Sequence, residues 1–173
     1  MKFQVIFWLV TLTTVVTYSQ INHGLRDESG RHVIPRGFVI NTNDHKGEVV
    51  FDSDDYVRMV RMGANTQVIR LELGKLSSFP GGKLDQNYLL KLDTLVTLGR
   101  NSGMKTVFKM TVYGVDKFIW EEFWLNKNNE YQTYINAWKV IWNRFSNDSS
   151  VLGYDVVNEP RKLTMDISYT DLT

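Results

Sequence analysis

Hydrophobic and polar residues alternate along this chain with two different periods, one typical of strands and one typical of helices. Four short segments rich in apolar and β-branched residues predict strands, over residues 33–40, 65–73, 104–112 and 151–157. Between them, apolar residues recur every three or four positions and predict helices, from Asp52 to Gly63, from Asp85 to Gly103 and over residues 129–145. Strands and helices therefore follow one another in alternation.

Each predicted helix has an apolar stripe that we expect to face the core. In the first helix, Asp52 is an N-cap candidate with further acids in the first turn, which suits the positive end of the helix dipole. The stripes are Tyr56, Val57, Met59, Val60 and Met62 in the first helix, Tyr88, Leu89, Leu92, Leu95, Val96 and Leu98 in the second, and Tyr131, Tyr134, Ile135, Trp138, Ile141, Trp142 and Phe145 in the third. Trp138 and Trp142 lie four residues apart, so both are expected to be core residues.

This order of elements predicts an α/β fold with a parallel sheet, whose strands are joined by right-handed helical crossovers. The spacing of the strands matches the repeat of a (β/α)8 TIM barrel, but a complete barrel needs ~250 residues. The sequence therefore predicts about four βα units, the N-terminal half of such a barrel. A doubly wound open sheet is the alternative, although no glycine-rich phosphate-binding turn follows Ile40.

The first nineteen residues predict a secretory signal peptide, residues 1–19. Lys2 gives a basic start, an apolar run covers residues 3–16, and small residues precede the expected cleavage after Ser19. A buried N-terminal strand is the alternative. Later segments fall short of the ~20 apolar residues that a membrane span requires. We therefore expect residues 20–173 to be secreted, to the extracellular space or the periplasm, as one soluble domain.

The composition narrows the classes of partner. The chain has 20 basic and 19 acidic residues, and the predicted signal peptide contains one of the basic ones, Lys2, so 19 of each remain. This balance argues against nucleic acid or an anionic membrane as a partner, because both favour clustered positive charge. Cysteine is absent, so the fold must be stabilised by its core rather than by disulfides. The three histidines are scattered, so we expect neither a metal site nor a cofactor.

Asn158-Glu159-Pro160 follows the fourth predicted strand directly and is the strongest candidate for chemistry. In a parallel barrel, side chains at the carboxyl ends of the strands point into the active site. A carboxylic acid beside an amide suits glycoside cleavage, because Glu159 can protonate the leaving oxygen while Asn158 binds a sugar hydroxyl. Alternatively, Asn158 caps a following helix and Glu159 is a solvated acid in its first turn.

From about Arg36 to Arg161 the sequence resembles glycoside hydrolase family 5, whose members are retaining (β/α)8-barrel glycosidases with paired glutamates. The segments that carry the resemblance are Arg36-Gly37-Phe38, GANTQVIRL over residues 63–71, GMKTV over 103–107 and VLGYDVVNEP over 151–160. The resemblance implies double displacement with retention of configuration. It makes Glu159 the acid/base and Asn158 the amide that contacts the sugar 2-hydroxyl.

Arg70 matches the arginine on the second strand of this family, which holds the nucleophilic glutamate ionised and oriented. A guanidinium suits this task, because it is permanently charged and offers a planar fork of donors. The alternative is a local pair between Arg70 and Glu72, whose side chains are expected on the same side of the strand.

Two features depart from the family pattern. Many members carry a histidine at the end of the third strand, whereas this chain has the sequence KMTVYG over residues 109–114, in which Tyr113 offers a hydroxyl. The nucleophile belongs to the seventh strand, and none of Glu72, Glu121, Glu122 and Glu130 matches it. We therefore expect the chain alone to be an inactive fragment, whose partner is the missing C-terminal half of the barrel.

Further substrate contacts are expected from two loops at the carboxyl ends of the strands. The loop over residues 111–128 carries Tyr113, Trp120 and Trp124, whose rings could stack on sugars or simply pack beneath the loop. After the first strand, Asn41 and His45 could bind substrate or form turns.

Together with Asn158 and Glu159, the resemblance implies hydrolysis of O-glycosidic bonds in a β-linked polysaccharide or oligosaccharide by a cellulase-like endo-β-glucanase. For that family cellulose-like β-glucan is the default substrate class, and mannan, other glucans and the glycans of glycolipids are alternatives. The competing hypothesis is a non-catalytic or vestigial half barrel that only binds carbohydrate.

Overall fold

The computed structural model describes residues 25–26, 29–44, 47–48, 50–76, 84–111, 120–126 and 129–158, with the backbone alone at 43–44, 47–48, 111 and 120–122. The predicted signal peptide, residues 1–19, lies outside these ranges. The chain divides into two compact units, Met1–Pro35 and Arg36–Thr173. In the first unit, Arg26 and His32 form an isolated antiparallel bridge, and the Val33 amide donates to the Leu25 carbonyl at 2.7 Å.

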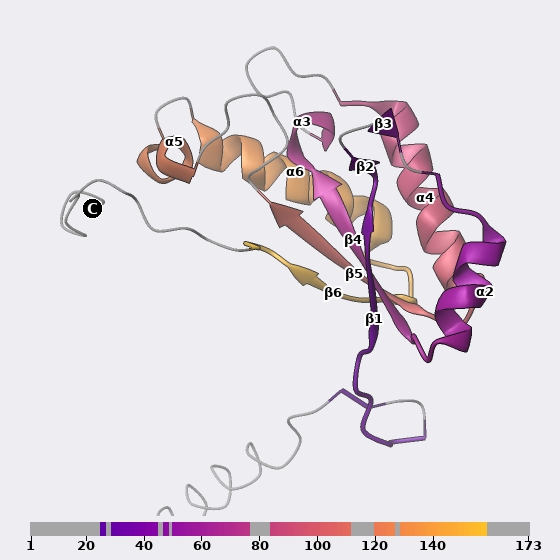
Figure 1. The fold of residues 1–173 in the computed structure, drawn as a ribbon. Helices are drawn as coiled ribbons and strands as arrows, with labels where there is room; N and C mark the ends of the chain where they lie inside the picture. Colours follow the sequence, from indigo (N-terminus) through magenta and orange to yellow (C-terminus); the bar gives the residue numbers. More distant parts are fainter. Residues whose placement is uncertain are drawn as a thin grey trace, which may run out of the picture. The chain divides into compact units, whose positions relative to one another are not determined.

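The second unit is built on a four-stranded parallel sheet (Figure 1). Its strands are β1 (Gly37–Asn41), β4 (Thr66–Glu72), β5 (Lys105–Thr111) and β6 (Val151–Asp155), and they lie side by side in this order. A small antiparallel pair, β2 (Asn43–Asp44) and β3 (Gly47–Glu48), follows β1. Sequence order equals spatial order throughout the parallel sheet, as in a barrel and unlike a doubly wound sheet, where the order reverses. The predicted N-terminal half barrel is confirmed.

In the described parts of the connections there are three long helices and two short ones, whose arrangement Figure 1 shows. The long helices are α2 (Ser53–Arg61), α4 (Gln86–Asn101) and α6 (Glu130–Phe145), and the short ones are α3 (Leu73–Leu76) and α5 (Trp120–Leu125). The short helices correct the prediction, because α3 was not expected and α5 occupies part of the predicted loop over residues 111–128.

The predicted helix ends are confirmed, and local chemistry explains them. The Asp52 carboxylate accepts from the amides of Asp54 and Asp55, and the Asp55 side chain accepts from the Asp52 amide in return, which forms a capping box. Gly63 follows the end of α2 with a φ of +89°, a left-handed conformation that glycine adopts without strain.

Within the described residues, helices cover one face of the sheet, and no helix or strand covers the other, which we call the open face. Gln67 identifies the covered face, because its side chain contacts two helices. Its Oε1 accepts from the Tyr56 hydroxyl of α2 at 2.6 Å, and its Nε2 donates to the Leu95 carbonyl of α4 at 3.0 Å. Gln67 Nε2 also donates to Thr106 Oγ1 of β5 at 2.9 Å, so both the oxygen and the nitrogen of this buried side-chain amide have hydrogen-bond partners. Side chains alternate along a strand, so the residues between the buried ones face the open side.

Strand β1 starts later than predicted, and strand β6 ends earlier. Strand β1 begins at Gly37 instead of residue 33, because Gly37 pairs with Thr66, the first residue of β4, and Pro35 has no amide hydrogen to donate. Strand β6 ends at Asp155 instead of residue 157.

The core prediction is wrong for several residues of the helical stripes. Tyr56 and Met59 of α2 are buried, as are Tyr134, Ile141 and Phe145 of α6. The exposed members of the α2 stripe are Val57, Val60 and Met62, and those of the α6 stripe are Tyr131, Ile135 and Trp142. Trp142, expected in the core, is 57% exposed. These side chains belong to the helices beside the two edge strands, where a closed barrel would place further βα units.

The Gln67 network leads to a prediction about stability. A Cβ at position 99 would lie 2.2 Å from Gln67 Nε2, so Gly99→Ala should force the amide out of its bonds. We expect a loss of about 1–3 kcal/mol in the free energy of unfolding, measured by urea denaturation. Gly153→Ala is the control, because its new methyl group would meet nothing within 4 Å. Equal losses in both variants would contradict this account.

Candidate functional site

A row of polar residues crosses the open face of the sheet near the carboxyl ends of the strands. Asn41 pairs with Arg70, Arg70 with Lys109 and Lys109 with Asp155, so the four residues lie at one level on neighbouring strands. The residues just before them, Ile40, Ile69, Phe108 and Tyr154, face the helices. Asn41, Arg70, Lys109 and Asp155 therefore face the open side, and we call them the polar row.

An apolar layer lies beneath the polar row, towards the amino ends of the strands. Val39 pairs with Val68, Val68 with Val107, and Val107 with Gly153. Such layers fill the interior of a closed barrel and leave the carboxyl ends for chemistry. The polar row is therefore the level that directly follows this apolar layer towards the carboxyl ends of the strands.

Arg70 is half-buried in this row, and its predicted alternative pairing with Glu72 is not observed. The Glu72 carboxylate accepts from the Thr42 hydroxyl and lies 3.8 Å from Lys75 Nζ. Among the residues that the structure describes, Arg70 forms no ion pair. The role of orienting a nucleophile remains a prediction.

Asn158 lies where the ends of β5 and β6 meet. Its backbone amide donates to the Met110 carbonyl at 3.2 Å, and its side-chain Nδ2 donates to Asp155 Oδ2 at 2.9 Å. The other side-chain atom, Oδ1, is buried and has no hydrogen-bond partner within the described part of the chain. Asn158 therefore sits beside the polar row with one acceptor available.

Two side chains of α6 fix the strand end that precedes Asn158. The Tyr134 hydroxyl lies 2.5 Å from the Val156 carbonyl oxygen and 3.1 Å from that of Met110, and Trp138 Nε1 donates to the Val156 carbonyl at 3.1 Å. Burial raises the pKa of Tyr134 to about 12, so the hydroxyl keeps its proton at neutral pH. The sequence identified both residues only as core.

The other predicted site residues divide into two groups. Glu159, His45 and Tyr113 lie outside the described residues, and Trp120 begins α5 with its backbone alone described. Trp124 is half-buried on α5, with its ring edge-on to Phe123 at 5.2 Å, and its carbonyl accepts from the Tyr131 hydroxyl at 2.8 Å. The structure thus places Asn41, Arg70 and Asn158 near the carboxyl ends of the strands, and it adds Lys109 and Asp155, which the sequence did not single out.

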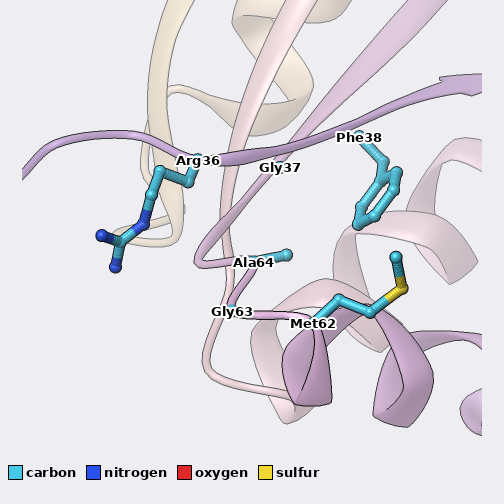
Figure 2. A pocket seen from close by; sticks show the side chains of 6 residues that line it. All are labelled: Arg36, Gly37, Phe38, Met62, Gly63 and Ala64. Carbon is cyan, nitrogen blue, oxygen red and sulfur yellow. The ribbon is translucent and has the colours of Figure 1, made fainter.

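A pocket lies at the other end of the sheet, around the first residues of β1 (Figure 2). Its lining residues are Arg36, Gly37, Phe38, Met62, Gly63 and Ala64. Figure 2 shows Phe38 and Met62 side by side, while the Arg36 side chain points away from them. The pocket lies at the amino end of β1, away from the polar row, and it offers no carboxylate for catalysis.

Neither a metal cluster nor a membrane span is present in the described ranges. No three His, Cys, Asp or Glu side chains there gather as ligands. None of the helices described is long and apolar enough to cross a bilayer.

The anchoring of the strand end by α6 can be tested. Tyr134→Phe should lower the free energy of unfolding by about 1–2 kcal/mol, because the Val156 and Met110 carbonyls lose the hydroxyl that they share. It should also speed hydrogen exchange at the Asn158 amide, measured by NMR. Tyr131→Phe, which removes an exposed hydroxyl from the same helix, should change both quantities less. Unchanged exchange at Asn158 would refute the anchor.

Comparisons with known proteins agree with this architecture. The family model "Cellulase (glycosyl hydrolase family 5)" matches residues 27–170. No curated protein matches the chain. Among solved structures, an endogalactoceramidase is 18% identical with a TM-score of 0.70, over 82% of this chain and 44% of the other.

Two further structures show the same fold. Endo-glycoceramidase II from Rhodococcus sp. is 24% identical with a TM-score of 0.66, over 81% of this chain and 42% of the other. Endoglucanase Cel5A from Thermotoga maritima is 18% identical with a TM-score of 0.54, over 72% and 40%. The chain spans less than half the length of each of these structures. Because the family model covers most of the sequence, the chain belongs to glycosyl hydrolase family 5 and has the fold of the N-terminal half of a (β/α)8 barrel.

Proposed function

We propose that this chain carries the acid/base half of a retaining glycoside hydrolase that cleaves within β-linked glycans. The observation that carries the proposal is the position of Asn158, held at the ends of β5 and β6 next to Asp155, the member of the polar row on β6. Glu159 is the next residue along the chain. An amide and a carboxyl group at the carboxyl end of a barrel strand are what such a site requires.

In the proposed reaction, Glu159 first acts as an acid and then as a base. It donates its proton to the glycosidic oxygen while a nucleophilic carboxylate, ~5 Å away, attacks the anomeric carbon. In the second step, Glu159 takes a proton from the water that releases the sugar from the enzyme. Asn158 Oδ1, which has no partner in the described chain, would accept a hydrogen bond from a sugar hydroxyl.

The nucleophile would come from further βα units, which we propose complete the barrel. Exposed apolar side chains flank both edges of the sheet: Phe38, Val39, Val57 and Met62 on the β1 side, and Ile135, Trp142, Val156 and Val157 on the β6 side. Unpaired parallel edges bordered by apolar surface favour the addition of strands. The guanidinium of Arg70, which has no anionic partner in the described residues, would then orient the incoming carboxylate.

The substrate class that we propose is a β-linked glycan. Cellulose-like β-glucan and the glycan of a glycolipid are the two substrates to compare, because the similar structures include an endoglucanase and endo-glycoceramidases. Substrate choice resides largely in loops, so a common fold does not select between them.

The acid/base role is tested with the chain assembled with the units that complete its barrel. Glu159→Gln should lower turnover of substrates with poor leaving groups by about 10²–10⁴-fold, because the leaving oxygen is no longer protonated. The first step on activated aryl glycosides should be largely spared. Asp54→Asn, an exposed carboxylate on α2, is the control and should leave both activities unchanged.

Two outcomes would refute parts of this proposal. Equal loss on both substrate types would contradict the acid/base role of Glu159. Turnover by the 173-residue chain alone would contradict the need for a nucleophile from outside it. Binding of glycans without turnover in the assembled barrel would favour the carbohydrate-binding alternative.

We also propose that the protein is exported and cleaved after Ser19. Expression with the native N-terminus should yield a secreted or periplasmic product that begins at Gln20, which mass spectrometry of the intact protein can measure. An intracellular product that retains Met1 would contradict this proposal.

A further inference from the structure

Two cations stand next to each other in the polar row. Arg70 of β4 and Lys109 of β5 are register partners in a parallel pair, so their backbones lie only ~4.8 Å apart. Both side chains leave the sheet on the open face. Like charges at directly opposed positions destabilise a sheet, so this arrangement works against folding unless an anion lies between them.

No such anion is present among the residues that the structure describes. Neither Arg70 nor Lys109 has a carboxylate within ion-pair distance there. Asp155 is the register partner of Lys109 on the other side, but one of its oxygens accepts from Asn158 Nδ2 at 2.9 Å and it forms no ion pair with Lys109. The half-buried cation pair therefore keeps its charge unbalanced within this part of the chain.

Other cations of the second unit behave differently. Arg100 pairs with Asp148, and Arg144 pairs with Asp93 through two nitrogens. Lys105, on the same strand as Lys109 but near its amino end, donates to the Ser149 carbonyl at 3.1 Å. Arg100, Arg144 and Lys105 thus have bonding partners of a kind that Arg70 and Lys109 lack among the described residues.

We propose that Lys109 forms a subsite for an acidic sugar, one that carries a carboxylate or a sulfate group. The inference rests on the proposed function. In that function the nucleophilic carboxylate pairs with Arg70, so the positive charge of Lys109 remains available for another anion. Asn158 Oδ1, the buried acceptor beside the row, would take a hydroxyl of the same sugar. An ammonium group suits this task, because its charge-assisted hydrogen bonds to an anion are stronger than those of a neutral donor.

Binding measurements on the full chain test this subsite without requiring turnover. The probes are cellobiose, the matching disaccharide with a terminal glucuronate, and cellobiose bearing a 6-sulfate on its terminal sugar, each titrated calorimetrically at low salt. We expect at least one acidic disaccharide to bind about tenfold tighter than cellobiose, because one charge-assisted hydrogen bond is added. Preference for the glucuronate alone assigns a carboxylate, and preference for the sulfate alone assigns a sulfate ester.

Matched variants connect the preference to Lys109. Lys109→Met should abolish the preference, Lys109→Arg should retain most of it, and Lys105→Met should leave it unchanged. Lys109→Met should also raise the urea midpoint of unfolding, because the repulsion with Arg70 disappears. This second readout does not depend on any sugar.

The outcomes separate this inference from the function on which it rests. Equal binding of neutral and acidic disaccharides, or a preference that survives Lys109→Met, overturns the acidic subsite and leaves glycoside hydrolysis intact. Failure of all three disaccharides to bind also overturns the subsite and leaves the proposed function intact, because that function requires the completed barrel. An unchanged or lower urea midpoint for Lys109→Met refutes the claim that repulsion between Arg70 and Lys109 destabilises the folded chain.

Discussion

The register of four parallel strands is the constraint on which the rest of this structure depends. Because β1, β4, β5 and β6 pair without a change of order, residues distant in sequence fall at the same level. A slip of one residue in any pair would turn its open-face side chains towards the helices. The polar row, the valine layer beneath it and the place of Asn158 all follow from this register.

Periodicity and capping chemistry were enough to predict the fold. The alternation of strand and helix gave the parallel half barrel, and Asp52, Asp85 and Gly63 marked helix ends that the structure confirms. Strand ends were less predictable, because a strand extends only as far as its partner does. The start of β1 at Gly37 is set by Thr66, 29 residues further along the chain.

The burial of helical side chains was predicted less well than the fold, because periodicity does not show which neighbours a helix has. A stripe of apolar residues shows which side of a helix prefers to be covered, but not whether a neighbour covers it. Trp142 belongs to such a stripe and is nevertheless exposed beside the edge strand β6. At the site, Asn158 was found from its position at a strand end and Arg70 from the family resemblance, whereas Lys109 was noted only as a departure from a pattern. Its significance depends on the pairing with Arg70, which a single sequence does not contain.

The hydrogen bonds from Tyr134 and Trp138 to the Val156 carbonyl give helix α6 two tasks. The helix covers the sheet, and it also holds the chain just before the residues assigned to chemistry. Replacements at Ile141 or Phe145 affect packing alone, so during evolution any side chain of similar volume would serve there. Tyr134 and Trp138 must keep both volume and a donor in a fixed direction. Among descendants of this sequence, these two positions should therefore change more slowly than the equally apolar positions one turn away.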